Sequence, residues 1–455
     1  MRFTLIKQNL LQYTCKILLI QLKDRFIINI DFLWRKNMVI EKQMRKNITL
    51  ILPLALLSAG LLVTSCGSTA ETKESAPKST PEVSAYIRTW PIGARAELDK
   101  GIHWTADQIH GEYLQDIIIS FALIDQNDKS TLYVKDMEDQ ESEITPGHIV
   151  SGFKNLWQEV DALKKKFPHL KINLSVGGWG AEFSDTAYYP ETRTKFIANV
   201  IDWLEKYKLD GVDIDWEYPV GPEWGMEIKT RPEDRENYIS LLSELRTALN
   251  SLGTRTGKYY KLSTAVPASG WFVERNDVIA AAKIVDALKL MSYDYYGSWS
   301  ETTGHHANLR QNPDDPAWGG WSTAQAVDKY LEAGVPADKL VLGLAFYGRA
   351  WKGVPAGGTN GLFQKFEGVP NPDSISWGEI ENLLQPGSGY TRYWDNVAKS
   401  PFLYNSDTFI SYTDPEAIKL IIAYVKEKKL GGVMYWEYAW DMEAKLLKVV
   451  NENLR

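Results

Sequence analysis

The sequence predicts an α/β protein built on a (β/α)8 TIM barrel, with a small α+β insertion between the seventh and eighth strands. From Val83 onward, eight short apolar or β-branched runs alternate with longer segments of helical period. Strands that alternate with helices form parallel sheets, and eight of them can close into a barrel. Over eighty residues separate the run ending at Phe346 from the run starting at Gly432, more than one helical crossover requires. This excess predicts the inserted domain.

The predicted strands are the short apolar or β-branched runs of the sequence. The eight runs are residues 83–90, 116–123, 171–176, 211–217, 260–266, 287–293, 340–346 and 432–436. Between them, apolar residues recur every three or four positions, which is the period of a helix face. The clearest examples are Phe196, Val200, Leu204 and Tyr207 in one segment and Tyr238, Leu241, Leu242, Leu245 and Leu249 in the next.

Two later helices are indicated by their N-terminal residues. Ser322 followed by Gln325 is typical of a capping box, and Asp414 followed by Pro415 is typical of an N-cap before a first-turn proline. We therefore expect the last barrel helix to span Pro415 to Lys428. Residues 352–405, which precede it, are rich in Gly, Pro and aromatic residues, and we predict that they form the α+β insertion.

The N-terminal part resembles a bacterial lipoprotein signal. A basic segment starts at Met44, an apolar run extends from Ile48 to Val63, and Cys66 follows in a short small-residue motif. The run is short for a spanning helix, which needs about 20 apolar residues, although a retained transmembrane anchor is the alternative. The resemblance implies lipidation of Cys66 and an exported protein anchored to a membrane of the cell envelope, on the periplasmic side or the cell surface.

The predicted parts of the chain are a doubtful N-terminal extension (1–43), a signal peptide (44–65), a flexible tether (66–82), the barrel (83–351 and 406–455) and the insertion (352–405). Residues 1–65 hold 10 of the 51 Lys and Arg and 3 of the 58 Asp and Glu, so the rest carries a formal charge of −14. Such a surface predicts no binding of nucleic acid. The 2 cysteines, Cys15 and Cys66, leave no thiol in the barrel for a disulfide or a metal.

The run from Asp210 to Glu217 packs four carboxylates into one apolar segment. Side chains alternate along a strand, so Asp213, Asp215 and Glu217 would share one face while Val212, Ile214 and Trp216 pack outward. Like charges held roughly 7 Å apart and taken from water are costly unless they share protons or find partners. The alternatives are a solvated acidic edge, which apolar intervening residues disfavour, and a calcium loop, whose glycine and glutamate spacing is missing. The run therefore predicts acid catalysis.

The C-terminal ends of the other strands carry residues that suit a sugar. In a barrel of this kind the active site lies at these ends, where Ser175-Val176-Gly177-Gly178 closes the third strand. Rings can stack on the apolar faces of a sugar while carboxylates bond its hydroxyls. The aromatic residues predicted at strand ends are Tyr86, Trp90, Phe121, Trp179, Tyr218, Trp271, Tyr293, Trp351 and Trp436.

These motifs resemble the signatures of family 18 glycoside hydrolases, the chitinases. Ser175-x-Gly177-Gly178 and Asp210-x-x-Asp213-x-Asp215-x-Glu217 correspond to the two signatures, and Met291-x-Tyr293-Asp294, Phe346-Tyr347-Gly348-Arg349 and Trp436 extend the resemblance. The segment from Gly389 to Tyr412 resembles the insertion domain of one chitinase subgroup, which deepens the substrate groove. The resemblance implies hydrolysis of chitin or chito-oligosaccharides with retention of configuration.

The resemblance also implies roles for individual residues. Glu217 would donate a proton, Asp215 would orient the substrate's acetamide, Asp213 would share a proton beneath it, and Tyr293 would bond the acetamide. The substrate's own N-acetyl oxygen would attack the anomeric carbon, and Asp210 would give structural support. The residues implied in substrate binding are Trp436, Asp294, Met291, Arg349, Tyr347, Tyr86, Phe121, Trp179 and Tyr218.

Several alternatives stay open at this point. Asp294 and Arg349 could instead form a structural ion pair. The 6 histidines, which include adjacent His305 and His306, show no metal-ligand spacing and suggest a surface loop, so no metal or cofactor is implied. A sugar-binding lectin and an endo-β-N-acetylglucosaminidase acting on N-glycan cores are the rival functions. The presence of Glu217 as a proton donor favours an enzyme over a lectin. We expect the protein to be monomeric.

Overall fold

A computed structural model describes residues 81–90, 104–134, 156–222, 228–317 and 321–454. The predicted extension 1–43, the signal peptide 44–65 with the adjoining Cys66, and the tether through residue 80 lie outside this part of the chain. Within the described ranges, no helix has both the length and the apolar character needed to cross a membrane.

The described chain is built on a closed barrel of parallel strands, as predicted. Eight strands pair side by side in the order β1-β14-β8-β7-β6-β5-β4-β2, and β1 pairs with both β14 and β2, which closes the ring. The barrel strands are β1 (Glu82–Arg88), β2 (Asp116–Ile124), β4 (Lys171–Gly177), β5 (Gly211–Asp215), β6 (Lys261–Pro267), β7 (Ala287–Met291), β8 (Leu340–Ala345) and β14 (Gly432–Trp436). A short strand that was not predicted, β3 (Leu132–Val134), pairs antiparallel with β2.

Four strands (β1, β5, β7 and β8) end one or two residues earlier than predicted, and for β5 and β7 this affects the site. β5 ends at Asp215 and β7 at Met291, so Glu217 and Tyr293 lie just beyond their strands. The outward positions of β5 pack as expected. Trp216 is 1% exposed and stacks against Phe183 at 5.4 Å between ring centroids.

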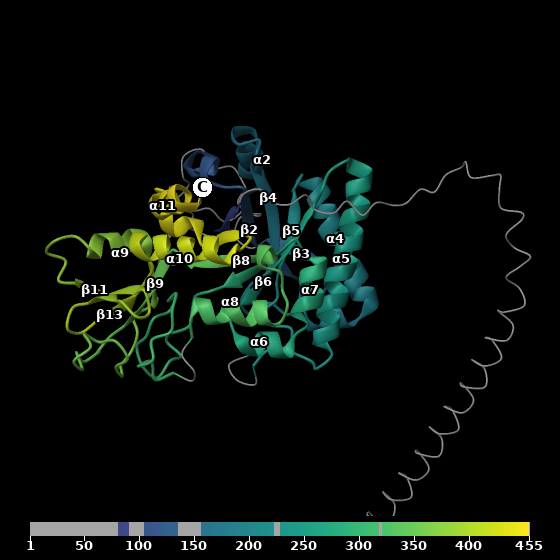
Figure 1. The fold of residues 1–455 in the computed structure, drawn as a ribbon. Helices are drawn as coiled ribbons and strands as arrows, with labels where there is room; N and C mark the ends of the chain where they lie inside the picture. The colour runs from purple at the N-terminus through teal and green to yellow at the C-terminus, as the bar shows by residue number, and fades with distance from the viewer. Residues whose placement is uncertain (1–80, 91–103, 135–155, 223–227, 318–320, 455) are drawn as a thin grey trace, which may run out of the picture. The chain divides into compact units, whose positions relative to one another are not determined.

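Helices cover the outside of the barrel, and Figure 1 shows α4 and α5 on the side of the strands opposite to the insertion. The apolar faces predicted for α4 and α5 are buried, except that Tyr207 lies at the C-cap of α4 and is only partly buried. The α-helices of the described chain are α2 (Leu156–Lys166), α3 (Ser184–Tyr188), α4 (Pro190–Lys206), α5 (Asp234–Thr256), α6 (Gly270–Arg275), α7 (Val278–Ile284), α8 (Thr323–Glu332), α9 (Trp377–Leu383), α10 (Pro415–Lys428) and α11 (Lys445–Leu454).

The N-cap predicted at Asp414 is present, and the capping box predicted at Ser322 forms in part. Asp414 accepts from the backbone N–H of Ala417, and α10 has the predicted bounds. The Ser322 side chain accepts from the backbone N–H of Gln325, but the Gln325 amide donates to Gln311 rather than closing a capping box.

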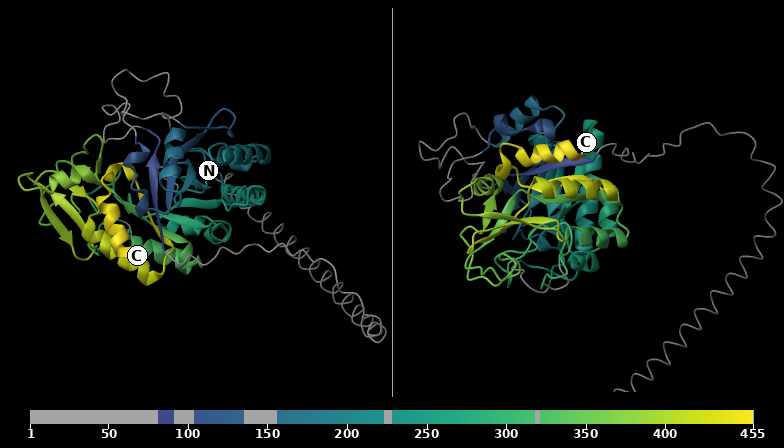
Figure 2. Two further views of the ribbon diagram at one scale, coloured as in Figure 1. Left: turned by 90° about the horizontal axis from the view of Figure 1, so that it is seen from above. Right: turned by 60° about the vertical axis from the view of Figure 1, so that its left-hand side comes forward.

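The insertion forms a second, antiparallel sheet in the order β10-β9-β13-β12-β11. Its strands are β9 (Tyr347–Trp351), β10 (Ser374–Ser376), β11 (Thr391–Asp395), β12 (Ser400–Tyr404) and β13 (Phe409–Ser411). The sheet thus takes in residues on both sides of the predicted range 352–405, because β9 follows β8 after a single residue. It has its own apolar core, which includes Trp351, Phe402 and Phe409. In both views of Figure 2 its green and yellow strands stand beside the barrel.

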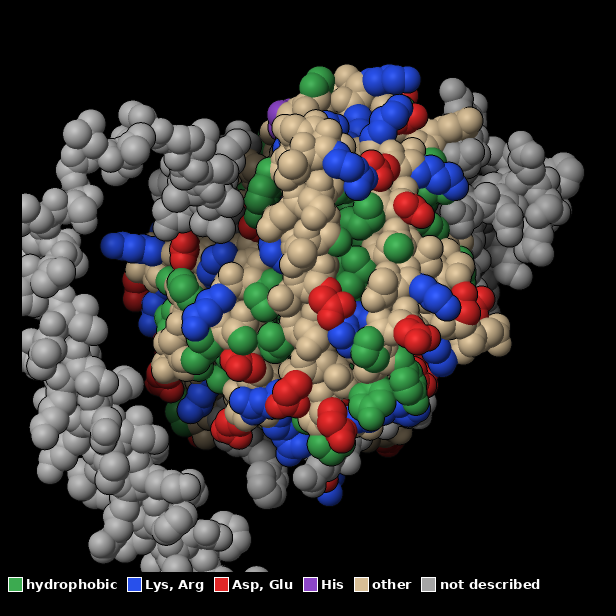
Figure 3. Space-filling view, turned by 90° about the vertical axis from the view of Figure 1, so that its right-hand side faces the viewer, with side chains coloured by type: hydrophobic (Ala, Val, Ile, Leu, Met, Phe, Trp, Pro, Cys, Tyr) green, Lys and Arg blue, Asp and Glu red, His purple; other side chains and the backbone are tan. Residues whose placement is uncertain are grey.

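Charged side chains of both signs are interspersed over the face drawn in Figure 3. Acidic and basic groups alternate there, and no broad basic patch covers the described part of this face. A protein that binds a polyanion would present clustered Lys and Arg.

Candidate active site

Asp213 is the deepest of the strand carboxylates. Its side chain is fully buried and accepts three hydroxyl hydrogen bonds, from Tyr86 (2.9 Å), Ser175 (2.9 Å) and Ser263 (2.6 Å). The two serines lie in register with Asp213 on the neighbouring strands β4 and β6. By contrast, Asp210 bonds Lys164 at 2.7 Å and the backbone N–H of Ile172, which is the structural role expected of it. The four carboxylates are therefore not equivalent.

Asp215 lies above Asp213 and has one side-chain oxygen that is unpartnered among the described residues. Its side chain is 4% exposed, and its Oδ1 atom makes no hydrogen bond within the described chain. Burial, then the charge of Glu217, then that of Asp213 raise the pKa of Asp215 well above its ordinary value. A buried polar atom without a partner is costly, so this oxygen suits a ligand donor.

Glu217 is the outermost of the three and is partly exposed. Burial raises its pKa to about 7, a hydrogen bond from Tyr218 lowers it, and the charge of Asp294 raises it. A carboxyl with this pKa is protonated in about half of the molecules at neutral pH and can release its proton, as a general acid must.

The turn after β4 brings two glycines against the carboxylate strand. Gly177 and Gly178 have φ values of 124° and 92°, and the Gly178 N–H donates to the Asp215 carbonyl at 2.9 Å. A Cβ on Gly177 would lie 2.0 Å from that carbonyl oxygen. Both positions therefore require glycine. The close approach of this turn to the Asp215 carbonyl holds the C-terminal end of β5 in place.

Trp436 closes the base of the site with a group of stacked rings. Its ring centroid lies 5.6 Å from Phe121 at an interplanar angle of 15°, and 6.2 Å from Trp90. Tyr86 approaches it at 6.0 Å but is only 2% exposed, with its hydroxyl committed to Asp213. Tyr86, which the sequence placed among the substrate contacts, is thus a support beneath the site in this structure.

Tyr293 and Met291 pack beside Trp436 in the same small cluster of side chains. Burial raises the pKa of Tyr293 well above its ordinary value, followed by the charges of Asp215, Asp294, Glu217 and Asp213. The Tyr293 hydroxyl therefore remains a hydrogen-bond donor near the carboxylates.

Asp294 and Arg349 form an ion pair, the alternative left open by the sequence. Arg349 Nε lies 2.9 Å from Asp294 Oδ1, to which Tyr347 also donates at 2.7 Å. Burial raises the pKa of Asp294, but Arg349 and His306 outweigh burial and hold this pKa well below its usual range. Arg349 also bonds Asp373 at 2.9 Å, so the pair ties the barrel rim to the insertion.

One exposed ring and several partly exposed rings lie near the carboxylates. Trp179 is 71% exposed, and its ring lies 6.5 Å from that of Tyr218, which lies 5.2 Å from Trp271. A hollow of about 200 Å³ opens beside Trp271 and includes Trp321 in its lining. Trp179, Tyr218 and Trp271 thus form a continuous row of rings beside Glu217.

Two rings differ from what the sequence suggested. Trp351 lies at a strand end, as predicted, but it ends β9 of the insertion sheet and is fully buried in the insertion core, where its Nε1 donates to the Gly297 carbonyl. Trp299 was missed although it is 58% exposed and its ring lies 5.1 Å from the Arg349 guanidinium carbon. The signal that could have found it is its place in the loop directly after Tyr293-Asp294.

The structure contradicts a surface-loop position for His305 and His306, whose exposures are 2% and 0%. His305 Nε2 lies 3.1 Å from Asp395 of β11. His306 Nε2 donates to the Tyr347 carbonyl at 3.2 Å, and its Nδ1 lies 3.8 Å from Asp294. The insertion folds over this loop and buries it, which the sequence of the loop alone does not reveal.

A buried ion pair below Trp436 was also missed. Arg88 Nε lies 2.8 Å from Glu437 Oε1, and the guanidinium carbon lies 5.3 Å and 5.1 Å from the rings of Trp90 and Trp440. Cis peptide bonds between non-proline residues occur at Ser120–Phe121 within β2, at Glu217–Tyr218 just beyond β5, and at Trp436–Glu437 at the end of β14. In the described residues, no cluster of three or more His, Cys, Asp or Glu side chains is arranged to hold a metal.

Comparison with known proteins agrees with this geometry. Residues 83–441 match the model of glycosyl hydrolases family 18. Chitinase A1 of Niallia circulans is 39% identical over 310 residues, which are 65% of this chain and 44% of that protein. Chitinase B of Serratia marcescens is 30% identical over 349 residues, which are 63% of this chain and 68% of that protein.

Solved structures are similar over most of the chain. A family 18 N-acetylglucosaminidase from Paenibacillus barengoltzii has a TM-score of 0.68 at 32% identity, covering 82% of this chain and 100% of that one. A chitinase from Bacillus thuringiensis has a TM-score of 0.71 at 30% identity, covering 83% and 70%. The chain spans less than half the length of Chitinase A1, since the match covers 44% of it. Because the family match takes in most of the chain, including the carboxylate strand and the insertion, the chain belongs to glycosyl hydrolases family 18.

Proposed function

We propose that this protein hydrolyses the β-1,4 linkages of chitin or chito-oligosaccharides. The observation that carries the proposal is the ordered carboxylate column, in which Asp213 is fully bonded, Asp215 has a free buried oxygen and Glu217 has a pKa of about 7. The chitinases named among the relatives support the same substrate class. A column of this kind fits an N-acetylated sugar because the free oxygen of Asp215 can accept the acetamide N–H.

The reaction needs no protein nucleophile in this proposal. Glu217 transfers its proton to the glycosidic oxygen as the bond from that oxygen to the anomeric carbon breaks. The acetamide oxygen forms a bond to the same carbon, giving a cyclic oxazolinium ion, and family 18 is among the exceptions that use such substrate assistance. Water then attacks the anomeric carbon and gives its proton to Glu217, so the configuration is retained.

The surrounding residues hold the sugar for this step. Asp215 orients the acetamide and stabilises the positive charge that develops on it, while Tyr293 donates to the acetamide oxygen. Trp436 stacks under the sugar at the cleavage point, with Met291 beside it. Asp294, Arg349 and Tyr347 form a bonded group at the insertion side, and Trp179, Tyr218 and Phe121 supply rings along the groove. We add Trp299 to the rings that contact substrate, because its ring is exposed.

A product profile from N-acetylated chito-oligosaccharides of defined length tests the proposed function. We expect shorter N-acetylated products, with no release of intact high-mannose glycan from a glycoprotein. Glycan release without cleavage of the oligomers would favour the endo-β-N-acetylglucosaminidase, and binding without any product would favour the lectin.

The pH dependence of kcat/KM reports the proton on Glu217. Because the protonated carboxyl is the working form, we expect activity to fall as pH rises through about 7, the pKa of Glu217. The negative charge of Asp294 helps to keep that proton on Glu217. Asp294→Asn should therefore lower the pKa of Glu217 and move the alkaline limb to lower pH. An alkaline limb that stays in place, measured with a chromogenic N,N'-diacetylchitobioside, would contradict this coupling.

We also propose that the protein is exported and anchored through a lipid on Cys66, a residue outside the described ranges. The support is the basic, apolar and Cys-containing motif of residues 44–67. Mass spectrometry of the native N-terminal peptide should find a lipidated cysteine, and Cys66→Ala should move the protein to the soluble fraction. An unmodified Cys66 in membrane-bound protein would instead favour a retained transmembrane anchor.

A further inference from the structure

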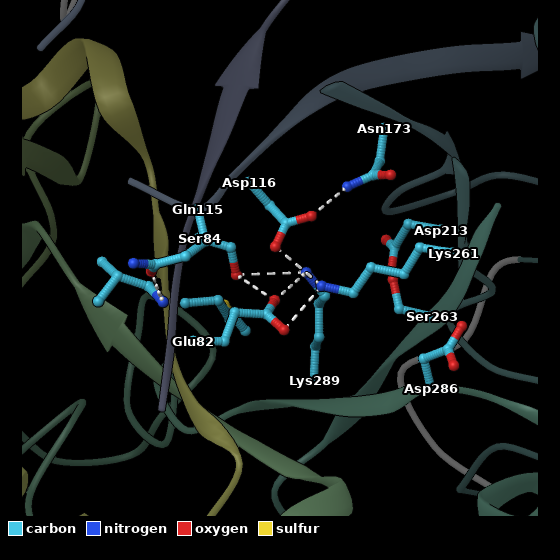
Figure 4. Close-up of polar contacts among 12 residues, drawn as sticks. Glu82, Ser84, Gln115, Asp116, Asn173, Asp213, Lys261, Ser263, Asp286 and Lys289 are labelled. Carbon is cyan, nitrogen blue, oxygen red and sulfur yellow. Dashed lines mark hydrogen bonds and ion pairs between the residues drawn. The ribbon is translucent and has the colours of Figure 1, made fainter. Parts of the chain in front are cut away.

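A cluster of four charged side chains, of which Glu82, Asp116 and Lys289 are buried and Lys261 is partly exposed, lies inside the barrel below the carboxylate column (Figure 4). Lys261 Nζ bonds Glu82 at 2.7 Å and Asp116 at 2.9 Å, and Asn173 donates to the other oxygen of Asp116 at 2.8 Å. Layers of branched apolar residues usually fill this part of a barrel. Burying ionised groups away from water costs free energy, so a charged cluster at this position suggests a functional role.

Lys289 is the member of the cluster nearest to the site. Its side chain is 0% exposed, and its Nζ lies 3.4 Å from Glu82 Oε1, 3.3 Å from Ser84 Oγ and 5.6 Å from the centroid of the Tyr86 ring. These contacts are longer than the 2.7–2.9 Å typical of a charge-assisted hydrogen bond. The Tyr86 hydroxyl in turn donates to Asp213. The ring of Tyr86 therefore connects the ammonium of Lys289 to the foot of the carboxylate column.

The charged and titratable groups around Lys289 come from several strands. Glu82 and Tyr86 belong to β1, Asp116 to β2, Asp213 to β5 and Lys261 to β6. The adjacent strand β8 (Leu340–Ala345) carries no titratable side chain. Burial lowers the pKa of Lys289, while the charge of Glu82 raises it. When all four groups are ionised, Lys261 and Lys289 balance Glu82 and Asp116, and the cluster as a whole is neutral. Removing one ammonium would leave an uncompensated negative charge under Asp213.

We propose that Lys289 is a positioning residue for the proposed hydrolase reaction, whose positive charge beneath Tyr86 favours negative charge on the carboxylate column above it. It acts through Tyr86 and through the electrostatic potential rather than by touching substrate. The inference rests on the proposed function for its meaning in catalysis, but its electrostatic content can be measured without turnover.

The sign of the effect follows from the charge balance. In Lys289→Met the cluster has a net negative charge, so ionisation of the carboxylates above it becomes harder and their pKa values rise. Both limbs of the pH profile of kcat/KM should then move to higher pH. In Glu82→Gln the cluster has a net positive charge, and both limbs should move to lower pH. In the double variant the charges balance again, and the profile should return toward that of the wild type.

The experiment compares these three variants with the wild type over a full pH range, using a chromogenic chitobioside. We expect opposite shifts of about one pH unit in the single variants, the size expected of one charge acting across a side-chain layer of low dielectric, and a smaller shift in the double variant. Circular dichroism and thermal melting establish that each variant is folded. If Lys289→Met does not fold, Glu82→Gln and the double variant still test the predicted directions.

Carboxyl titration by NMR in Asp- and Glu-labelled protein gives the same information without substrate. Shifts in opposite directions in a protein that does not cleave chito-oligosaccharides would support the inference and sink the proposed function. Unchanged or equally directed shifts in an active enzyme would overturn the inference and leave the function in place. A purely structural role for Lys289 predicts altered melting temperatures with no change in either pH limb.

Discussion

Replacing Glu217 by Gln is expected to abolish most turnover while sugar binding persists. The amide has nearly the same size as the carboxyl but no proton that it can transfer to the glycosidic oxygen, and general acid catalysis contributes about 10²- to 10⁴-fold. We expect kcat to fall by about this factor while Kd for a chito-oligosaccharide changes little. Hydrolysis of a chromogenic chitobioside measures kcat, and quenching of tryptophan fluorescence measures Kd.

Glu191→Gln is a matched control for that variant, because Glu191 lies exposed in the first turn of α4, away from the column. It should behave like the wild type in both assays. Near wild-type turnover by Glu217→Gln would show that another group donates the proton. Loss of binding together with turnover would show that the substitution had disturbed the groove itself.

Asp215→Asn is expected to have the second largest effect. The carboxylate Oδ1 has no partner in the described chain, and the proposed acetamide donor would supply one. The neutral amide loses the negative charge that stabilises the cyclic ion, and removing one such electrostatic contact costs about 10²- to 10³-fold in kcat. Steady-state kinetics should show the loss mainly in kcat, because the charge develops in the transition state.

Tyr293→Phe provides the scale for judging the Asp215 variant. It removes one neutral hydrogen bond to the acetamide, worth about 0.5–1.5 kcal/mol, or roughly tenfold at most. The Asp215 variant should therefore be the slower of the two by a clear margin. Equal losses in the two variants would mean that Asp215 acts as a simple hydrogen-bond acceptor and not through its charge.

The barrel and the carboxylate column could be predicted because both depend on local periodicity. Parallel strands in a barrel are continuous apolar runs, and alternation along β5 is enough to bring Asp213 and Asp215 to one face. Glu217 falls just outside the strand that was predicted to carry it. The prediction that Glu217 lies at the mouth of the barrel still applies, because it requires only that Glu217 follow Asp215 at the C-terminal end of β5.

The features that were missed depend on contacts between distant segments. His306 is buried because the insertion covers its loop, and its neighbour Tyr347 is 41 positions away. Lys289 meets Glu82 across 207 positions, and Arg88 meets Glu437 across 349. No local period predicts such pairs. Tyr86 was predicted at the correct strand end, but only the packed structure reveals that its hydroxyl is committed to Asp213.

The boundaries of the insertion illustrate the same limit. Its sheet starts with Tyr347, so the motif that contains Arg349 belongs to the insertion sheet as β9 and not to the barrel. The ion pair with Asp294 therefore joins the two sheets at the rim of the site. The change in composition at residue 352 coincides with the first loop of the insertion. The sheet itself begins earlier, at Tyr347, and only the pairing of β9 with other strands reveals this.

The most direct test of the central claim measures kcat for aryl chitobiosides whose acetamide next to the cleaved bond carries zero to three fluorine atoms. Fluorine withdraws electrons from the carbonyl oxygen and weakens it as a nucleophile, while the shape of the substrate changes little. If the substrate supplies its own nucleophile, kcat should fall steeply with each added fluorine. A kcat that is independent of fluorination would contradict substrate assistance and would require a nucleophile from the protein.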